Sequence, residues 1–342
     1  MTIQLTLLIP GLAGPRAAGP ALTAGLSLTA LETLLSRADR RPGGRGSTAE
    51  LLFAAFARCD GGDPPVASVS AAADLDADPG GWWLRADPVH LRADRDTLVL
   101  AGGESVTLTD DEAARLAAEL EPVFAPLGWR LHVGHPRRWY LRLSHDPGVR
   151  THDPDALVGE DIRPFLPHGA QRAAWHRLMN EVQMQLHDSP VNRERAARSV
   201  PAVNSLWFWG GGTAPRVRAR WDHLWCDHVV GRGLARITAT AAHPCPDGAA
   251  AWLDEAVPGG HLIVHEDLDR AGRPVDPERW RAAAQRFNEQ WAAPLLTALQ
   301  RGRLDRLALM TDTGVDFEVT PAGARRWWRR RGALERLLSA AG

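Results

Sequence analysis

Hydrophobic and polar positions follow a strand–helix rhythm at both ends of this chain. Gln4 to Ile9 has the apolar composition of a buried strand, and Pro10–Gly11 marks the turn that follows it. Leu22 to Ala38 and Leu51 to Arg58 have helical spacing, whereas Val66 to Ala71 predicts another strand. Strand–helix alternation returns in the last third of the chain. This rhythm predicts a doubly wound α/β sheet.

The middle of the chain has a different pattern. Thr109 to Phe124 predicts a helix that begins with a capping box, and two alternating stretches, Trp129–Val133 and Trp139–Leu143, predict antiparallel strands. Such a unit is α+β in character. We therefore expect residues 1–87 and 190–342 to form one discontinuous α/β domain, interrupted by an inserted α+β domain of residues 88–189.

Composition narrows the classes of partner. The 342 residues include 40 Lys+Arg and 41 Asp+Glu, a net charge of −1, so neither nucleic acid nor a membrane is an expected partner. Every basic residue is arginine, so a phosphate would be held by guanidinium groups or backbone amides rather than by lysine. Three widely spaced cysteines and an N-terminus without a signal pattern favour the cytoplasm.

The stretch Leu262–Asp316 carries the most chemical information. It predicts a strand, an acidic loop, a long helix, a second strand and a second acidic loop, which places carboxylates at the carboxyl ends of two strands. Such ends are where open α/β sheets bind ligands. Possible metal ligands cluster around the end of the first strand, namely His261, His265, Glu266, Asp267 and Asp269. Asp312 ends the second strand. Ordinary solvated acidic loops explain the same pattern.

Two other segments have both a structural and a functional interpretation. Ser47 follows the turn-rich segment Arg40–Gly46 at a helix start, where it is a possible nucleophile, but Ser47 and Glu50 also form a capping box. The arginine- and tryptophan-rich segment Arg325–Arg331 could bind polyanions. A solvated terminal helix whose tryptophans pack inward is the favoured interpretation.

Several motifs, taken in order, resemble the archaeal-type cofactor-independent phosphoglycerate mutases of the alkaline phosphatase superfamily, and among them the RpfE-type regulatory proteins of proteobacteria. The motifs are LLIPGLAG, GRGSTAELLF around Ser47, WLRADPVHL around Arg85, and HDSPVNRERAARSVPAVNSLWFWGGG. The last is the most specific, and the closing half from Leu262 to Gly314 completes the match. The resemblance implies an alkaline-phosphatase-like fold and a serine flanked by two divalent ions.

The chain departs from this pattern at ligand positions. Pro10 stands where the opening strand normally supplies an aspartate, Arg273 stands where a histidine follows Asp269, and Thr313 stands where a histidine follows Asp312. Neither proline nor threonine replaces these ligands, and a guanidinium repels a metal ion. The departures predict that at least three metal ligands are missing.

We therefore expect a catalytically degenerate mutase-like protein with a phosphate-sized anion cleft and a binding or regulatory role. The alternative is an active metal-dependent mutase or related phosphoryl-transfer enzyme with shifted ligands. The expected site consists of Ser47 as a vestigial nucleophile and of Arg85, Arg273, Asn192 and Arg193 as anion-binding residues. No metal is expected. If Mn or Zn binds, Asp269, Asp312, His265 and Asp267 are the expected ligands. A small phosphorylated or anionic ligand and a protein partner are the expected partners.

Overall fold

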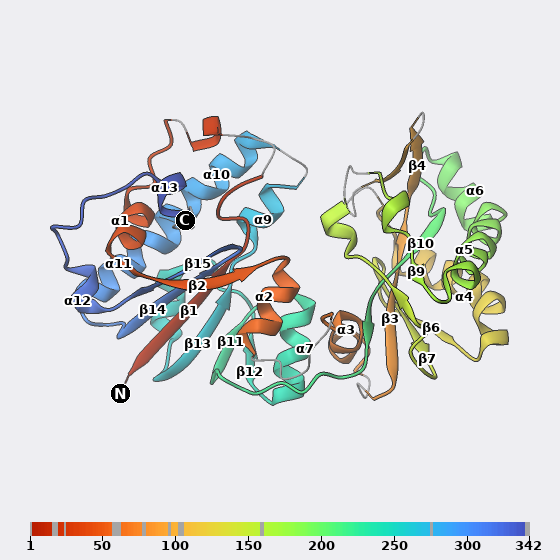
Figure 1. Cartoon of the computed structure of the whole chain (residues 1–342), viewed down its shortest axis with the longest axis horizontal. Coiled ribbons are helices and arrows are strands. Elements are labelled where there is room, and N and C mark those ends of the chain that lie inside the picture. The colour runs from red at the N-terminus through yellow and green to blue at the C-terminus, as the bar shows by residue number, and fades with distance from the viewer. Residues whose placement is uncertain are drawn as a thin grey trace. The chain divides into compact units, whose positions relative to one another are not determined.

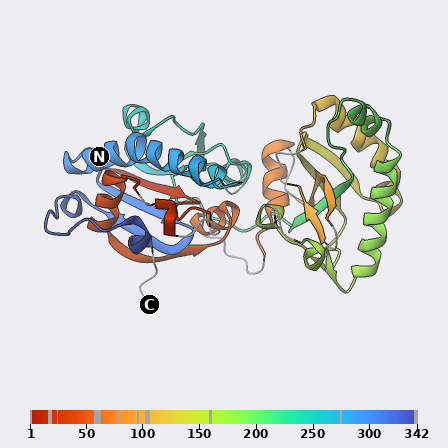
Figure 2. The same cartoon turned by 90° about the horizontal axis from the view of Figure 1, so that it is seen from above.

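A computed structural model describes residues 2–15, 20–23, 25–56, 63–76, 80–94, 97–101, 106–157, 161–273 and 276–338 of the chain. The chain divides into two compact units, each with its own sheet (Figures 1 and 2). Unit 1 comprises Met1–Arg58 and Val217–Gly342, and unit 2 comprises Cys59–Arg216.

Unit 1 is built on a seven-stranded mixed sheet with the strand order β12-β11-β13-β1-β14-β15-β2 (Figure 1). The strands are β1 (Ile3–Ile9), β2 (Asp39–Arg45), β11 (His223–Trp225), β12 (Ala241–His243), β13 (Gly259–Val264), β14 (Arg306–Thr311) and β15 (Thr313–Val319). Strand β1 lies parallel to β13 and β14, whereas β15 is antiparallel to both β14 and β2. Strands β2, β14, β1 and β13 therefore all point their carboxyl ends toward the same edge.

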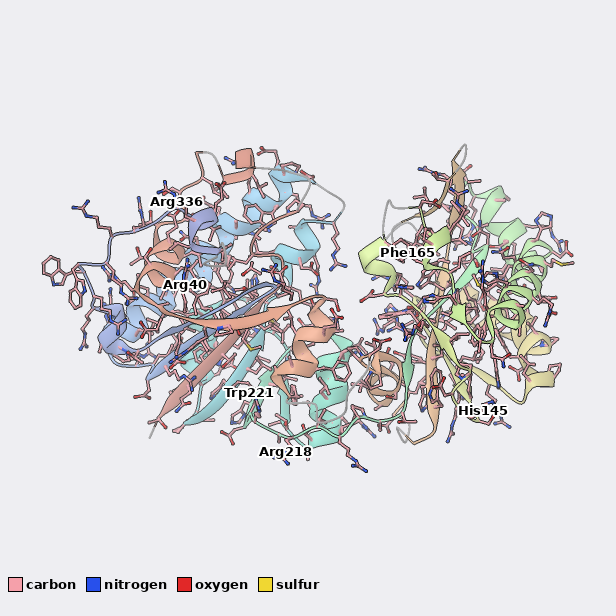
Figure 3. All side chains as sticks on the ribbon, viewed as in Figure 1. Arg40, His145, Phe165, Arg218, Trp221 and Arg336 are labelled. Atoms are coloured by element: carbon pink, nitrogen blue, oxygen red, sulfur yellow. The ribbon has the colours of Figure 1, made fainter. Side chains whose placement is uncertain are left out.

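Strand β2 forms where the sequence predicted a loop. It is an edge strand, a position that tolerates Pro42 because the missing N–H is not needed on the outer side. Its Arg40 side chain, labelled in Figure 3, lies 5.9 Å from the Phe317 ring centroid and donates to the carbonyl oxygen of Arg336 at 3.3 Å. The edge is thereby tied to the C-terminal helix.

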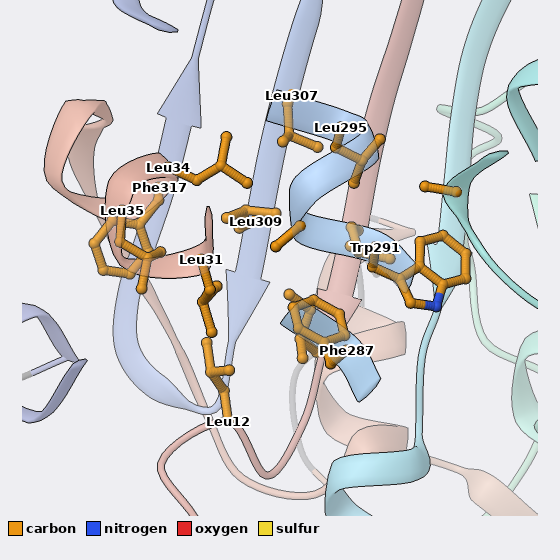
Figure 4. Close-up of a cluster of buried hydrophobic side chains, with 14 of the residues drawn as sticks. Leu12, Leu31, Leu34, Leu35, Phe287, Trp291, Leu295, Leu307, Leu309 and Phe317 are labelled. Carbon is orange, nitrogen blue, oxygen red and sulfur yellow. The ribbon is translucent and has the colours of Figure 1, made fainter. Parts of the chain in front are cut away.

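Both faces of the unit 1 sheet carry buried apolar side chains. Leu5, Leu7 and Ile9 point into one core with apolar residues of the helices. Figure 4 shows part of this core, including Leu31 and Leu295. Leu8 and Val264 point to the opposite face and are equally buried. This is the doubly wound α/β arrangement that the sequence predicted.

The helices of unit 1 are α1 (Thr29–Arg37), α2 (Thr48–Ala55), α7 (Val229–Thr238), α8 (Ala249–Glu255), α9 (Asp267–Ala271), α10 (Pro277–Phe287), α11 (Ala293–Gln300), α12 (Pro321–Ala324) and α13 (Leu334–Leu338). A short 3-10 turn, η2 (Pro20–Thr23), and a π-helical turn, η6 (Asn288–Ala292), complete the set. Helix α10 begins at the predicted cap, since the Asp276 carboxylate accepts from the amides of Glu278 and Arg279. Within the described residues no helix is long and apolar enough to cross a membrane.

Unit 2 has a four-stranded antiparallel sheet in the order β10-β3-β7-β6. Its strands are β3 (Trp82–Val89), β6 (Arg130–His135), β7 (Arg138–Leu143) and β10 (Ser205–Gly212), with small two-stranded sheets of β4 (Leu91–Asp94) with β5 (Thr97–Leu100), and of β8 (Val149–Arg150) with β9 (His168–Gly169). Its helices are α3 (Val66–Asp74), α4 (Asp110–Phe124), α5 (Arg172–His187) and α6 (Pro190–Ala197), and its 3-10 turns are η3 (Ala125–Leu127), η4 (Pro154–Leu157) and η5 (Arg163–Phe165). Helices α4 and α5 lie side by side and share a core with the sheet (Figures 1 and 2).

Two sequence interpretations differ from this unit. Val66–Ala71, predicted as a strand, begins helix α3, because its small Ala67 and Ala71 fit closely against Trp83 and Tyr140. The compact unit is also wider than the predicted insertion of residues 88–189. Strand β3 pairs with β10 through Val89 and Ser205, so segments assigned to the α/β domain complete this sheet instead.

Candidate functional site

The carboxyl edge of the unit 1 sheet brings together residues from four strands. Ile9 pairs with Thr311 and Leu8 with Val264, so the residues that follow β1, β14 and β13 meet at one edge. These include Gly11 and Asp312. Because Arg45 at the end of β2 pairs with Thr313, Ser47 joins the same edge. The fold therefore brings Ser47 and Asp312, which the sequence analysis selected from distant segments, to one edge of the sheet.

Gly11 is the centre of this edge. Its amide donates to Asp312 Oδ2 at 3.2 Å, and its carbonyl oxygen accepts from Trp280 Nε1 at 2.9 Å. Its φ of +74° is in the left-handed region, and a Cβ there would lie 2.6 Å from the Asp269 amide nitrogen. Asp312 and the backbone of Asp269 therefore contact the same glycine, and only glycine fits between them.

Asp269 and Arg273 form a three-fold hydrogen-bonded ion pair in and just after helix α9. Arg273 Nη2 lies 2.9 Å from both carboxylate oxygens of Asp269, and Arg273 Nε lies 3.2 Å from Oδ1. The two side chains are one helical turn apart, so the pair is local and well formed. The permanently charged Arg273 guanidinium thus bonds the Asp269 carboxylate, which the resemblance assigned to a metal ion.

Asp312 and Thr313 complete this part of the edge. The Asp312 Oδ1 atom is buried and has no hydrogen-bond partner, whereas the Thr313 hydroxyl is paired with the Thr311 hydroxyl at 2.8 Å. Thr311 also donates to the Val315 carbonyl oxygen. The threonine therefore serves the β14–β15 turn, and one carboxylate oxygen remains without a partner.

The described side chains of this edge do not supply the donors of a two-metal centre. Among the described residues no group of three or more His, Cys, Asp or Glu side chains is placed to hold a metal ion. The Gly11 amide already donates to Asp312 Oδ2, and the Arg273 guanidinium already donates to both carboxylate oxygens of Asp269. One unpartnered oxygen on Asp312 does not make a site for a divalent cation.

Ser47 is the N-cap residue of helix α2. Its Oγ accepts from the Glu50 amide at 3.4 Å, while its own amide donates to Glu50 Oε2 at 2.7 Å. This is the reciprocal capping box that the sequence predicted. Ser47 is half-buried, and the bond that its Oγ makes to the Glu50 amide serves the cap of the helix.

Arg45 was missed by sequence reasoning. Its guanidinium packs on Gly314, where a Cβ would lie 2.7 Å from Nε, and its side chain is exposed. It belongs to the same edge as Ser47 and Asp312 through its pairing with Thr313. The Gly-Arg-Gly-Ser sequence contains this arginine, but its place at the edge follows only from the pairing of β2 with β15.

His265 is a core histidine. Its ring packs edge-on against Phe287 and Trp291, at centroid distances of 5.0 and 5.4 Å. Burial lowers the pKa of His265 to about 4, so the ring is neutral at pH 7. Asp267 Oδ2 lies 3.9 Å from its Nε2 and is largely exposed. Among the described residues, His265, Asp267 and Asp269 do not form a group that could hold a metal ion.

Glu266 and His228 form a second polar pair on this edge. Burial raises the pKa of Glu266 to about 7, while Arg270 Nη2 donates to its Oε2 at 2.9 Å. His228, the N-cap of α7, accepts from the Val230 amide through Nδ1 at 3.2 Å, which leaves the proton on Nε2. That nitrogen lies 3.9 Å from Glu266 Oε1. His228 follows a three-residue strand, too short for periodicity to reveal.

In unit 2, Arg85 is used internally. Its Nε and Nη2 bond the two oxygens of Asp87 at 2.9 and 2.8 Å, and its guanidinium lies 5.2 Å from the Tyr140 ring and 5.0 Å from the Trp209 ring. Asp87 also accepts from Trp209 Nε1 at 2.7 Å. The arginine is 4% exposed and holds three strands of the sheet together.

Asn192 and Arg193 also lie in unit 2. The Asn192 amide is buried, donates to the carbonyl oxygens of Leu186 and Val203, and accepts from the Val203 amide. It therefore fixes the chain after α5 to the segment before β10. Arg193 is exposed at a groove of about 530 Å³, and its Nη1 donates to the Asp188 carbonyl oxygen at 3.1 Å.

The chain is similar in sequence to known proteins at low identity. No protein-family model matches the chain. It is 28% identical over 263 residues to the 2,3-bisphosphoglycerate-independent phosphoglycerate mutase of Methanosarcina mazei, which covers 69% of this chain and 65% of that protein. It is 25% identical over 235 residues to the protein of the same name from Methanothrix thermoacetophila, covering 62% of this chain and 58% of that protein. The chain spans less than two thirds of the length of these relatives.

Solved structures are similar over nearly the whole chain. The PH0037 protein from Pyrococcus horikoshii matches with a TM-score of 0.55 and 14% identity, over 94% of this chain and 88% of that one. The cofactor-independent phosphoglycerate mutase from Thermoplasma acidophilum matches with a TM-score of 0.46 and 16% identity, over 93% of this chain and 89% of that one. The first of these structures, with a TM-score above 0.5, confirms the predicted alkaline-phosphatase-like α/β fold. In sequence the chain is similar to proteins named as phosphoglycerate mutases.

Proposed function

We propose that this chain is a catalytically degenerate relative of the cofactor-independent phosphoglycerate mutases. It binds a small anion at the carboxyl edge of unit 1 and acts as a binding or regulatory protein of the RpfE type. The observation that carries the proposal is the ion pair of Asp269 with Arg273, in which a guanidinium bonds both carboxylate oxygens at 2.9 Å.

A resident guanidinium changes the chemistry of the edge. A divalent metal ion activates a hydroxyl by lowering its pKa and stabilises the charge that develops on a phosphoryl group. Arg273 supplies positive charge but cannot coordinate an oxygen ligand as a metal ion does. It also hydrogen-bonds the Asp269 carboxylate oxygens that a metal ion would coordinate. Phosphoryl transfer through Ser47 would therefore lack the Lewis acid that a metal ion supplies, while the attraction for an anion remains.

Anion binding is supported by the cations at the same edge. Arg45 is exposed beside Gly314, and Arg273 is 37% exposed at its side chain. Guanidinium groups bind phosphate through paired N–H donors, which Arg45 can supply, while Arg273, whose Nε and Nη2 bond Asp269, adds positive charge to the same edge. We infer that the ligand is a phosphate or a small phosphorylated acid.

Titration calorimetry with inorganic phosphate and with 3-phosphoglycerate tests this proposal. We expect saturable binding by the native chain and roughly tenfold weaker binding in Arg45→Gln and in Arg273→Gln, as for the loss of one charge-assisted contact. Arg41→Gln is the matched control, because Arg41 lies on the same strand, is 62% exposed at its side chain and lies 3.8 Å from Glu318. Equal binding by all four proteins would show that the edge is not the anion site.

A coupled assay for conversion of 3-phosphoglycerate to 2-phosphoglycerate addresses the metal-dependent alternative. We expect no turnover above background with added Mn²⁺ or Zn²⁺. Turnover that requires the metal and disappears in Asp269→Asn would establish an active enzyme with shifted ligands instead.

A further inference from the structure

Two exposed arginines of unit 2 face each other across neighbouring strands. Arg130 on β6 lies directly opposite Arg142 on β7, and neither makes an ion pair with a residue that the structure describes. Three other arginines of this unit each bond a carboxylate: Arg85 with Asp87, Arg138 with Asp74, and Arg195 with Glu112. The exposed pair is therefore a concentration of positive charge that the described residues do not neutralise.

Holding these two side chains opposite each other costs stability. Directly opposed residues of antiparallel strands have Cβ atoms about 4.5–5.5 Å apart, and like charges in such a pair repel each other. An exposed arginine can turn away, but the Arg142 guanidinium lies over the Trp83 ring, 5.5 Å from its centroid. A Cβ added to Gly81 would lie 3.4 Å from Arg142 Nε, so this side chain packs on both residues. Packing thus fixes one of the two cations in place.

His132 adds a third polar group to the same face of the sheet. It lies two residues after Arg130 on β6, so the two side chains share a face, and its ring centroid is 5.6 Å from that of Trp83. Burial, Arg142 and Arg130 lower the pKa of His132 and outweigh the opposing effect of Glu121, so the ring is neutral at pH 7. Its Nε2 atom is buried and has no hydrogen-bond partner among the described residues. One unsatisfied nitrogen therefore accompanies the two cations.

The arginine pair lies beyond the part of this face that helix α3 covers. Helix α3 packs against Trp83 and Tyr140, which are 2% and 0% exposed. Tyr140 is the residue opposite His132, and the next pair on the same face is Arg130 with Arg142, where both residues are exposed. A ligand from solution can therefore reach the two guanidinium groups.

The arginine-rich segment Arg325–Arg331 of unit 1 has a different arrangement. Arg326 bonds Asp39 at 2.7 Å, and other arginines of the segment bond backbone carbonyl oxygens, so these cations are used within unit 1. The segment is a turn rather than a helix, and its tryptophans, Trp327 and Trp328, are 81% and 63% exposed. The predicted terminal helix with inward-packed tryptophans is wrong.

We propose that Arg130, Arg142 and His132 form a second anion site, in addition to the carboxyl edge of unit 1, and that this site binds a phosphate group. Two guanidinium groups supply two positive charges and paired N–H donors, which match a doubly charged phosphate better than a single carboxylate. A bound anion lies between charges that otherwise repel each other, so it stabilises unit 2 as it binds. The phosphate is either free or part of a monoester.

Titration calorimetry distinguishes this site from the edge of unit 1. In the Arg45→Gln protein, whose unit 1 edge is weakened, we expect phosphate to bind still and acetate to bind roughly tenfold more weakly. Adding Arg130→Gln or Arg142→Gln to that protein should weaken phosphate binding roughly tenfold. Arg92→Gln is the matched control, because Arg92 is exposed on a strand of unit 2 but lies opposite Val99. Phosphoserine and inorganic phosphate represent the two sources, and the tighter binder identifies the source.

The titration of the His132 ring reports binding at this site. Nuclear magnetic resonance follows this ring, whose signal is assigned with His132→Gln. We expect saturating phosphate to raise the pKa of His132, because the anion offsets the two cations that lower it. The shift should disappear in Arg130→Gln and persist in Arg45→Gln.

Charge reversal tests the repulsion between the two arginines. Arg130→Glu places a carboxylate opposite Arg142, so in phosphate-free buffer it should raise the urea concentration at half-unfolding. It should also reduce the gain in stability that phosphate gives the native chain. Circular dichroism checks that each variant is folded. Phosphate binding that Arg130→Gln and Arg142→Gln leave unchanged, a His132 titration indifferent to phosphate, or an Arg130→Glu protein less stable than the native chain would overturn the proposal.

Discussion

Gly11 shows how one residue positions the candidate site. It joins Asp312 through its amide and lies against the Asp269 backbone with a φ of +74°. We expect Gly11→Ala to destabilise unit 1 by about 2–4 kcal/mol, because the left-handed conformation alone costs an alanine about 1–2 kcal/mol and the added Cβ overlaps backbone atoms. Urea denaturation measures the loss.

Gly25 is the matched control for this substitution. Its φ of +72° is almost the same, but apart from its chain neighbours no atom of the described residues lies within 4 Å of an added Cβ. Gly25→Ala should therefore lose only the conformational part, about 1 kcal/mol. Equal losses at the two positions would show that the contact with Asp269 is not tight.

His265 and Glu266 make the stability of unit 1 depend on pH in opposite directions. His265 has its pKa lowered to about 4 by burial, so its contribution is complete above its ordinary value of 6.5 and is lost as the pH falls from 6.5 toward 4. Glu266 has its pKa raised to about 7 by burial, so its contribution is complete below 4.5 and is lost as the pH rises toward 7.

Thermal unfolding between pH 4.5 and pH 6.5 separates the two residues. Glu266→Gln should steepen the loss of stability on acidification, because the histidine then acts unopposed, by at most a few kcal/mol across the window. His265→Gln should reverse the slope. If both variants follow the native curve, neither group is as buried as the structure places it.

At the scale of elements, Ser47 belongs to the start of helix α2. Both halves of its capping box are present, as they are at Thr109 in helix α4 of unit 2. We expect Ser47→Ala to destabilise the protein by about 1 kcal/mol and Ser47→Asp to preserve its stability, because aspartate caps equally well. Thr109→Ala is the comparison, measured by the same denaturation. A Ser47→Ala variant as stable as the native chain would remove the structural explanation of this serine.

Element types were predictable where the pattern was long and failed where context decided. The rule that carboxylates after parallel strands share an edge placed Asp269 and Asp312 near one another, and in the structure the Asp269 backbone and the Asp312 carboxylate both contact Gly11. The local pattern could not reveal that Arg40–Arg45 lies in an edge strand. Its partner is β15, which contains Phe317 and is far away in the sequence. Arg45 was missed for that reason. Likewise, the small residues of α3 resemble a strand until the aromatic rings opposite them are known.

At the scale of the whole molecule, the boundary of unit 2 was set by pairing rather than by alternation. Residues 88–189 omit β10 and most of β3, two of the four strands of its sheet. We expect a protein of residues 59–216 to unfold cooperatively in urea and to give a near-ultraviolet circular dichroism signal from its packed aromatic residues. A protein of residues 88–189 should show neither, because half of the sheet and its core contacts are missing.

The charge networks of unit 2 also show what sequence cannot assign. Arg85, Asn192 and Arg193 were selected for anion binding by resemblance, and that role stays a prediction. The structure gives Arg85 a buried partner in Asp87 and uses the Asn192 amide to hold Val203. Residue identity alone does not distinguish an arginine that faces a ligand from one that faces a carboxylate within its own sheet.

The metal content of the purified native chain tests the central claim most directly. Protein produced in medium supplemented with Mn²⁺ and Zn²⁺ would be analysed by inductively coupled plasma mass spectrometry after gel filtration. Because the Arg273 guanidinium bonds the Asp269 carboxylate and the Gly11 amide donates to Asp312, we predict far less than one metal ion per chain. Two tightly held ions per chain, lost in Asp269→Asn or Asp312→Asn, would contradict the account and establish a metal-dependent site.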